Sequence, residues 1–225
     1  MADSGRLYCR MNNAYLIPSH YGEAEFTEKR SRFTGRVWPI QSEEEAMRHL
    51  KEMRETYWDA THNVYAYILR ENGIMRYSDD GEPQGTSGQP TLNVFRSAEI
   101  QNVCCIVTRY FGGILLGTGG LVRAYSRAAK EALTAAGVSK VGLWDRVLTA
   151  CPYSLYERVR REFEAAGAIL EPPEFGADVS IEALLPTGTL TELQKSISEL
   201  SAGSVELLEM GSEYRAVPMP DRING

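Results

Sequence analysis

Five of the nine residues Gly112–Gly120 are glycine, and this density constrains the fold more than any other feature of the chain. The run follows the continuous apolar segment Val103–Phe111, "VCCIVTRYF", which is typical of a buried strand. It precedes apolar residues repeating at helical spacing from Leu121 onward, and Gly137 is placed to end that helix. The sequence therefore predicts a buried strand, a glycine turn and a long helix, in that order.

Neither of the two standard glycine-rich nucleotide motifs fits this run. Counted from Gly117, the dinucleotide fingerprint G-x-G-x-x-G has Val122 where its third glycine belongs. Gly112 and Gly117 have the spacing of a Walker A loop, but Thr118-Gly119 replaces the lysine and hydroxyl residue that bind phosphate and magnesium. Both motifs fail at a residue on which their chemistry depends.

A more general anion site remains open. A strand, a glycine turn and a helix place free backbone amides at the positive end of the helix. Arg109 precedes the turn, Arg123, Arg127 and Lys130 share helical spacing after it, and Phe111, like Tyr110, offers a ring for stacking. The alternative is a packing turn with solvated arginines. The candidate phosphate-binding or nucleic-acid-binding residues are Arg109, Tyr110, Gly112, Gly113, Gly117, Gly119, Gly120, Arg123 and Arg127.

A second loop, "SDDGEPQGTSGQP" (Ser78–Pro90), carries three carboxylates within four residues, on Asp79, Asp80 and Glu82. Carboxylates this close could bind Mg²⁺ or work as an acid and base pair, although the spacing is not that of an EF-hand. Ordinary turn chemistry explains the same residues and is favoured. His62 is a fourth catalytic candidate, but no serine or cysteine near it follows a nucleophile-elbow pattern.

Cysteine usage and hydropathy indicate a cytoplasmic protein. The four cysteines include no C-x-x-C pair, which argues against a zinc ribbon or a thioredoxin-type site. Cys104 and Cys105 are neighbours on the predicted strand, so their side chains should point to opposite faces. No secretory segment or membrane-spanning run is present in the sequence. We expect reduced thiols, no cofactor, no bound metal and no membrane partner.

Charge is distributed unevenly along the chain. The net charge is −6, which argues against a simple polyanion binder. Residues 1–140 hold 17 basic and 16 acidic residues, for a net charge of +1, whereas residues 141–225 hold 7 and 14, for −7. The N-terminal part can therefore still present a basic face.

Hydrophobic patterning predicts an α+β protein of two domains between two tails. In the first domain we expect strands within Glu23–Ile40 and Asn63–Arg70, a helix capped by Ser42 with Glu45 in a capping box, and a short helix after Pro90. From near Trp144 the elements follow the order β-α-β-β-α-β of a ferredoxin-like fold. The predicted divisions are a tail over 1–20, domains over 21–142 and 143–218, and a tail over 219–225.

Four stretches resemble the IMPACT family in its bacterial two-domain form, the YigZ type. They are "KRSRF" (Lys29–Phe33), "WDATHNVYAY" (Trp58–Tyr67), "SDDGEPQGTSGQP" (Ser78–Pro90) and "VTRYFGGILLGTGGLVRAYSRAA" (Val107–Ala129). The resemblance implies an N-terminal α/β domain with a left-handed βαβ crossover, like domain IV of elongation factor G. It also implies a ferredoxin-like C-terminal domain, similar to domain V of that factor.

The same resemblance implies a part in translation. Eukaryotic members regulate translation during amino-acid starvation through an extra N-terminal domain, for which this chain has no room. Three hypotheses follow: a translation regulator that binds RNA or the ribosome, an enzyme acting on a phosphorylated small molecule, and a protein-interaction module that docks through the acidic C-terminal domain. We favour the first, which is not an enzyme, and the sequence leaves the oligomeric state open.

Overall fold

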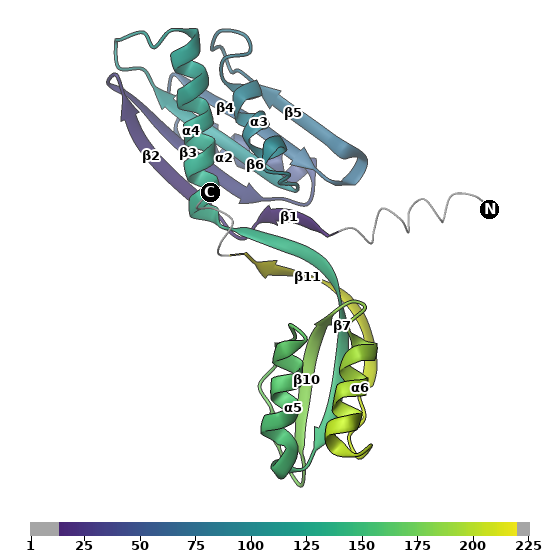
Figure 1. The fold of residues 1–225 in the computed structure, drawn as a ribbon. Helices are drawn as coiled ribbons and strands as arrows, with labels where there is room; N and C mark the ends of the chain where they lie inside the picture. The colour runs from purple at the N-terminus through teal and green to yellow at the C-terminus, as the bar shows by residue number, and fades with distance from the viewer. Residues whose placement is uncertain (1–13, 220–225) are drawn as a thin grey trace, which may run out of the picture. The chain divides into compact units, whose positions relative to one another are not determined.

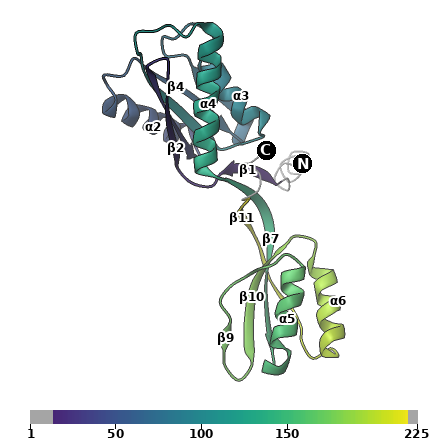
Figure 2. The same ribbon diagram turned by 60° about the vertical axis from the view of Figure 1, so that its left-hand side comes forward.

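The computed structural model describes residues 14–219, which divide into a larger unit, Tyr15–Lys140, and a smaller unit, Val141–Arg215. The α+β fold class is confirmed, with a mixed sheet-and-helix architecture in each unit (Figures 1 and 2). Strand β1 (Tyr15–Pro18) lies within the segment predicted to be an N-terminal tail. The rest of that tail, residues 1–13, and residues 220–225 lie outside the described residues.

The larger unit is built on a five-stranded sheet in the order β2-β3-β6-β4-β5, and every neighbouring pair is antiparallel. The sequence prediction missed β5, which has only two residues of apolar character at its start. The handedness of the βαβ crossover stays a prediction. The strands are β2 (Gly22–Glu28), β3 (Ser31–Pro39), β4 (His62–Leu69), β5 (Ile74–Ser78) and β6 (Val103–Tyr110).

Helices cover both faces of this sheet. On one face α3 (Gly88–Ser97) and α4 (Thr118–Ala136) lie side by side, and α2 (Glu43–Thr56) packs on the other (Figures 1 and 2). The two adjacent cysteines of β6 separate as expected: Cys105 joins the core under α3 and α4, and Cys104 joins the core under α2.

Local sequence explains the ends of the helices. Ser42 caps α2 by accepting a hydrogen bond from the amide of Glu45, and the Glu45 carboxylate accepts one from the amide of Gln41. Helix α4 ends at Ala136, and Gly137 follows with a positive φ of 66°, as predicted. Helix α3 begins before Pro90 rather than after it, because Asp79 supplies the hydrogen bonds that start it.

Helix α4 lies unusually close to the sheet because glycines face it. A Cβ atom added to Gly35 would come within 2.4 Å of the carbonyl oxygen of Ala128, and one added to Gly22 within 2.2 Å of the amide nitrogen of Ala136. Small residues on the helix, with alanine at 128, 132 and 136, complete this seam. The second half of α4 is therefore packed closely against β2 and β3.

The smaller unit has the strand order β11-β7-β10-β8, which is that of a ferredoxin-like fold, with β9 paired to β10. Its helices α5 (Tyr153–Ala165) and α6 (Leu190–Ser201) pack on a core that includes Val147, Phe163 and Ile197. The first strand is longer than predicted and begins within the larger unit. The strands are β7 (Val138–Cys151), β8 (Ile169–Leu170), β9 (Glu174–Phe175), β10 (Val179–Pro186) and β11 (Leu208–Pro218).

Candidate functional site

The glycine loop, residues 111–117, joins β6 to α4 and packs against the turn between β2 and β3. A Cβ atom at Gly112 would lie 2.1 Å from the backbone carbonyl of Arg30, so only glycine fits there. The Gly112 amide also donates to the hydroxyl of Ser31 over 3.1 Å. Gly113 and Gly117 have positive φ angles of 81° and 73°, which glycine adopts without strain.

The first turn of α4 presents open backbone amides. The first hydrogen bond of the helix runs from Leu121 N to Gly117 O, and Gly117 provides no side chain to cap the turn. Within residues 14–219, the amides of Thr118, Gly119 and Gly120 donate no hydrogen bond. A Cβ atom at Gly119 would meet only the guanidinium of Arg123, at 3.5 Å. Neither backbone angle nor packing therefore requires glycine at this position.

Basic side chains surround a small pocket beside this turn. The pocket has a volume of about 230 Å³, and its lining includes the basic residues Lys29, Arg123 and Arg127 and one acidic residue, Glu28, together with Phe26 and Gly120. Arg127 pairs with Glu131 of the next helical turn at 2.7 Å and stacks over the Phe26 ring at 4.1 Å. The side chains of Lys29, Arg30 and Arg123 form no ion pair with any described residue.

Arg109 is absent from this surface because its guanidinium points into the unit. The residue is 4% exposed, and it forms a close ion pair with Glu82 and donates to the Ser31 hydroxyl at 3.3 Å. A buried arginine already neutralised by a carboxylate cannot meet a phosphate at the surface. The structure thus separates Arg109 from Arg123 and Arg127, which sequence spacing had grouped together.

Glu82 links its own loop to β6 and α4, the strand and helix on either side of the glycine loop. Its carboxylate accepts hydrogen bonds from Arg109 of β6 and from the hydroxyl of Tyr125 in α4, the latter at 2.8 Å. His62 Nε2 lies 3.8 Å from the same carboxylate oxygen. Burial, with the neighbouring charge of Glu82, raises the pKa of Tyr125 well above its usual range, so its phenol remains a donor. Sequence analysis gave no indication of this pairing.

Asp79 acts as a cap for α3. Its carboxylate accepts from the amides of Gly85, Ser87 and Gly88 over 2.8, 3.1 and 2.8 Å, and from the Ser87 hydroxyl over 2.7 Å. Partial burial alone would raise the pKa of Asp79, but these hydrogen bonds outweigh burial and lower it. The turn interpretation of this loop therefore describes Asp79 well.

Asp80 is held by residues of α2 and β4, and its carbonyl oxygen in turn orients His62. The Asp80 carboxylate accepts from Arg54 and from the amide of Asn63, both at 2.7 Å. His62 Nδ1 lies 2.7 Å from the carbonyl oxygen of Asp80, which can only accept, so Nδ1 carries the proton and Nε2 faces Glu82. Over residues 14–219 no group of three or more His, Cys, Asp or Glu side chains could hold a metal ion.

Tyr110 is half covered at the end of β6. Arg32 stacks on its ring at 4.6 Å, and its hydroxyl donates to Asp59 at 2.8 Å.

The candidate residues form two separate groups. The structure brings Glu82, His62 and Arg109 together inside the unit. It brings Gly117, Gly119, Gly120, Arg123 and Arg127 together at the surface.

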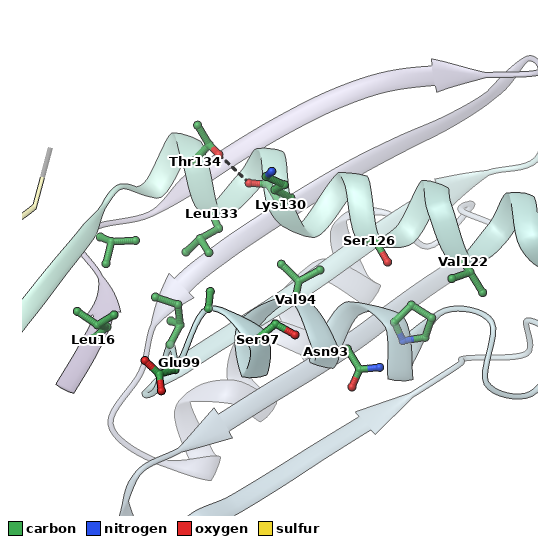
Figure 3. A pocket seen from close by; sticks show the side chains of 14 residues that line it. Leu16, Asn93, Val94, Ser97, Glu99, Val122, Ser126, Lys130, Leu133 and Thr134 are labelled. Atoms are coloured by element: carbon green, nitrogen blue, oxygen red, sulfur yellow. Dashed lines mark hydrogen bonds between the residues drawn. The ribbon is translucent and has the colours of Figure 1, made fainter. Parts of the chain in front are cut away.

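An apolar groove on a different face of α4 was not expected from the sequence. It has a volume of about 650 Å³ and lies between α3 and α4, where Val94 faces Leu133 and Val122 stands at one end (Figure 3). Lys130 lines this groove with Ser126, so it does not share the pocket of Arg123 and Arg127. Val94 on α3 and Val122 on α4, neither of which is fully buried, are the apolar residues that could have indicated it.

Known protein families match both units of the chain. The family model described as "Impact N-terminal domain" matches residues 29–133, and a domain of unknown function, DUF1949, matches residues 149–204. The IMPACT family member YvyE of Bacillus subtilis is 32% identical over 200 residues, covering 88% of this chain and 92% of the relative. The chain belongs to the IMPACT family.

Some relatives match most of the chain, whereas others match less than half of it. A relative from Thermus thermophilus is 41% identical over 180 residues, covering 78% of this chain and 96% of its own length. A solved structure titled "Crystal structure of an hypothetical protein" superposes with a TM-score of 0.55 at 28% identity, covering 87% of this chain and 96% of the other. Protein IMPACT of Rattus norvegicus, 32% identical over 108 residues, matches 45% of this chain and 33% of its own length.

None of the helices formed by the described residues is long and apolar enough to cross a bilayer.

Proposed function

We propose that the larger unit binds RNA phosphates at the first turn of α4, and that the protein regulates translation by contacting RNA or the ribosome. The observation that carries the proposal is the pocket that Lys29, Arg123 and Arg127 line together with Gly120, whose backbone amide is open in that turn. Amides at a helix N-terminus and nearby cations are the groups that bind phosphate in proteins. Membership of the IMPACT family supports translation as the setting.

The exposed glycine at position 119 supports the same proposal. Glycine in a helix costs up to about 1 kcal/mol of stability relative to alanine, and the local geometry at Gly119 does not require it. A residue without a side chain allows a ligand to approach the backbone closely. This is the behaviour expected where amides rather than side chains contact a phosphate.

The two alternatives draw less support. An enzyme would use Asp79, Asp80, Glu82 or His62, and each of the three carboxylates accepts hydrogen bonds from its own unit. A protein-interaction module would dock through the acidic smaller unit, where Arg146 pairs with Glu182 and with Glu213 on the sheet. Neither alternative has an observation as specific as the basic pocket.

Fluorescence anisotropy with a labelled RNA, repeated over a range of salt concentrations, tests the proposal. The double substitution Arg123→Glu and Arg127→Glu should weaken binding by about 100-fold at low salt. It should also reduce the slope of log K against log salt by about 0.7 for each single-strand phosphate that the protein no longer neutralises. Unchanged affinity and slope would remove the proposal.

A matched control comes from the smaller unit. Arg158 and Arg161 are exposed on α5 and form no ion pair within the described part of the chain. Arg158→Glu with Arg161→Glu changes the net charge by the same amount, so it measures the non-specific electrostatic effect. We expect this control to lower the affinity less than tenfold.

A further inference from the structure

Four large apolar side chains are exposed on two loops of the larger unit. Trp58 and Leu115 are each 82% exposed, Phe111 is 45% exposed and Ile114 is 40% exposed. A cluster of this kind on a protein surface is more often a contact surface than an accident of folding. We call these four residues the apolar tip.

Hydrogen bonds hold the two loops together. The amide of Thr61 donates to the Arg109 carbonyl at 2.9 Å, and the Phe111 amide donates to the Thr61 hydroxyl at 3.0 Å. The Tyr110 hydroxyl donates to Asp59, which follows Trp58 directly. The segment that carries Trp58 therefore lies against the start of the glycine loop.

The backbone before Trp58 is also fixed. Arg36 donates to the hydroxyl of Tyr57 at 2.7 Å and stacks on its ring, and the Tyr57 carbonyl accepts from Ala60 at 3.1 Å. An indole displayed on such a rigid turn loses little conformational freedom when it binds a flat partner. The turn that carries the ring is thus fixed, and the ring itself is exposed to solvent.

Cations lie at the same end of the sheet. The strand register pairs Arg32 with Tyr110 and His62 with Arg109. The β2–β3 turn, the Trp58 loop and the glycine loop therefore lie at the same end of the strands. That turn contributes Lys29 and Arg30, neither of which forms an ion pair with a described residue. Exposed aromatic rings beside unpaired cations are the combination used to bind single-stranded nucleic acid.

We infer that the apolar tip binds unpaired RNA nucleotides, with bases stacked on Trp58 and Phe111 while the phosphates follow the basic residues toward α4. The inference rests on the proposed function and makes it narrower, because it selects single-stranded RNA over duplex RNA. In a duplex the faces of the bases are stacked on one another and are closed to the indole.

The test compares three labelled RNAs: a 12-nucleotide oligouridine, an abasic ribose-phosphate 12-mer and a 12-base-pair duplex. All three carry phosphates, but only the oligouridine offers free base faces. We expect the wild-type chain to bind the oligouridine at least tenfold more tightly than the abasic strand, since stacking on one aromatic side chain contributes about that much. Trp58→Ala should remove most of the difference, leaving only what stacking on Phe111 contributes.

Two further variants define what the tip recognises. Trp58→Leu keeps an apolar side chain but removes the aromatic face, so it should behave like Trp58→Ala toward oligouridine. Tyr214→Ala, which removes another exposed aromatic residue, should leave the preference unchanged. Because Trp58 is so exposed, neither Trp58→Ala nor Trp58→Leu should alter the melting temperature. Thermal melts of each variant check this.

The outcomes separate the inference from the proposed function. Equal affinity of the wild-type chain for oligouridine and the abasic strand overturns the inference and leaves the phosphate site standing. Absence of binding to all three RNAs at low salt overturns both. Full retention of the preference by Trp58→Leu, or Trp58-dependent binding to phosphatidylserine vesicles without a preference for oligouridine, overturns the inference in favour of an apolar or lipid contact.

Discussion

Arg109 and Arg123 stand on either side of the glycine loop and have opposite surroundings. Arg109 is buried, bonded to Glu82 and Ser31, and contacts the rings of Phe33 and Phe111. Arg123 is exposed at the rim of the basic pocket and pairs with no described carboxylate. One motif thus carries an arginine that holds the loop in place and another that is open to a ligand. Spacing in the sequence does not distinguish them, whereas burial does.

The largest predicted difference is between Arg109 and Arg123, in what each contributes to the stability of the larger unit. Arg109→Ala leaves Glu82 buried without its charge partner, so it should lower the free energy of unfolding of the larger unit by about 3–5 kcal/mol. Arg123→Ala should change it by less than about 0.5 kcal/mol. Urea unfolding followed by far-ultraviolet circular dichroism measures both. Equal effects of the two substitutions would contradict the comparison.

The glycine that packs inward should be the next most sensitive. Gly112→Ala places a methyl group against the backbone of Arg30, and relieving this overlap should cost about 1–3 kcal/mol of unfolding free energy. Thermal unfolding monitored by calorimetry measures the loss. Gly85→Ala serves as a control for strain alone, because Gly85 has a positive φ of 75° but open space around it. A smaller loss at Gly112 than at Gly85 would count against close packing of the loop.

Asp79, whose carboxylate caps α3, tests the internal contacts of the larger unit through the pH dependence of its stability. Because its native pKa is lowered, its hydrogen bonds contribute stability that is fully present above the ordinary carboxyl pKa near 4. That contribution is lost as the pH falls through the lowered native pKa. Asp79→Asn should cost about 1–2 kcal/mol at pH 7, with the difference from wild type shrinking toward pH 2. Unfolding curves at several pH values measure this, and a difference that stays constant with pH would be the contrary result.

The smallest effect should appear at the outward-facing glycine. Gly119→Ala should raise the unfolding free energy by up to about 1 kcal/mol, because alanine favours the helix and meets little at this position. The same methyl group should weaken RNA binding a few-fold by blocking the amides. Calorimetry and anisotropy on one protein sample give both values. Greater stability with unchanged affinity would place the bound phosphate elsewhere.

Features that depend on residues close together in the sequence were predictable from it. The strand, glycine turn and helix, the Ser42 cap and the stop at Gly137 follow from residues within a few positions of one another. The ferredoxin-like order of the smaller unit follows from the spacing of its apolar runs. Family membership, expected from four long motifs, is confirmed by the comparisons.

Long-range pairing was not predictable in the same way. Glu82 and Arg109 are 27 residues apart and meet only because β4 lies between β5 and β6 in the sheet. Arg109 was grouped with Arg123 because it directly precedes the glycine turn, and its position in the sequence does not say which way a strand points its last side chains. The groove between α3 and α4 depends in the same way on two helices that the sequence does not bring together.

The glycine and alanine seam beneath α4 has a consequence for recognition. Backbone lies against backbone where Gly22 and Gly35 face the second half of α4, so no side chain can rearrange between helix and sheet there. This half of the helix cannot slide across β2 and β3 without a backbone clash, so we expect helix and sheet to keep their arrangement when a ligand binds at the other end of α4.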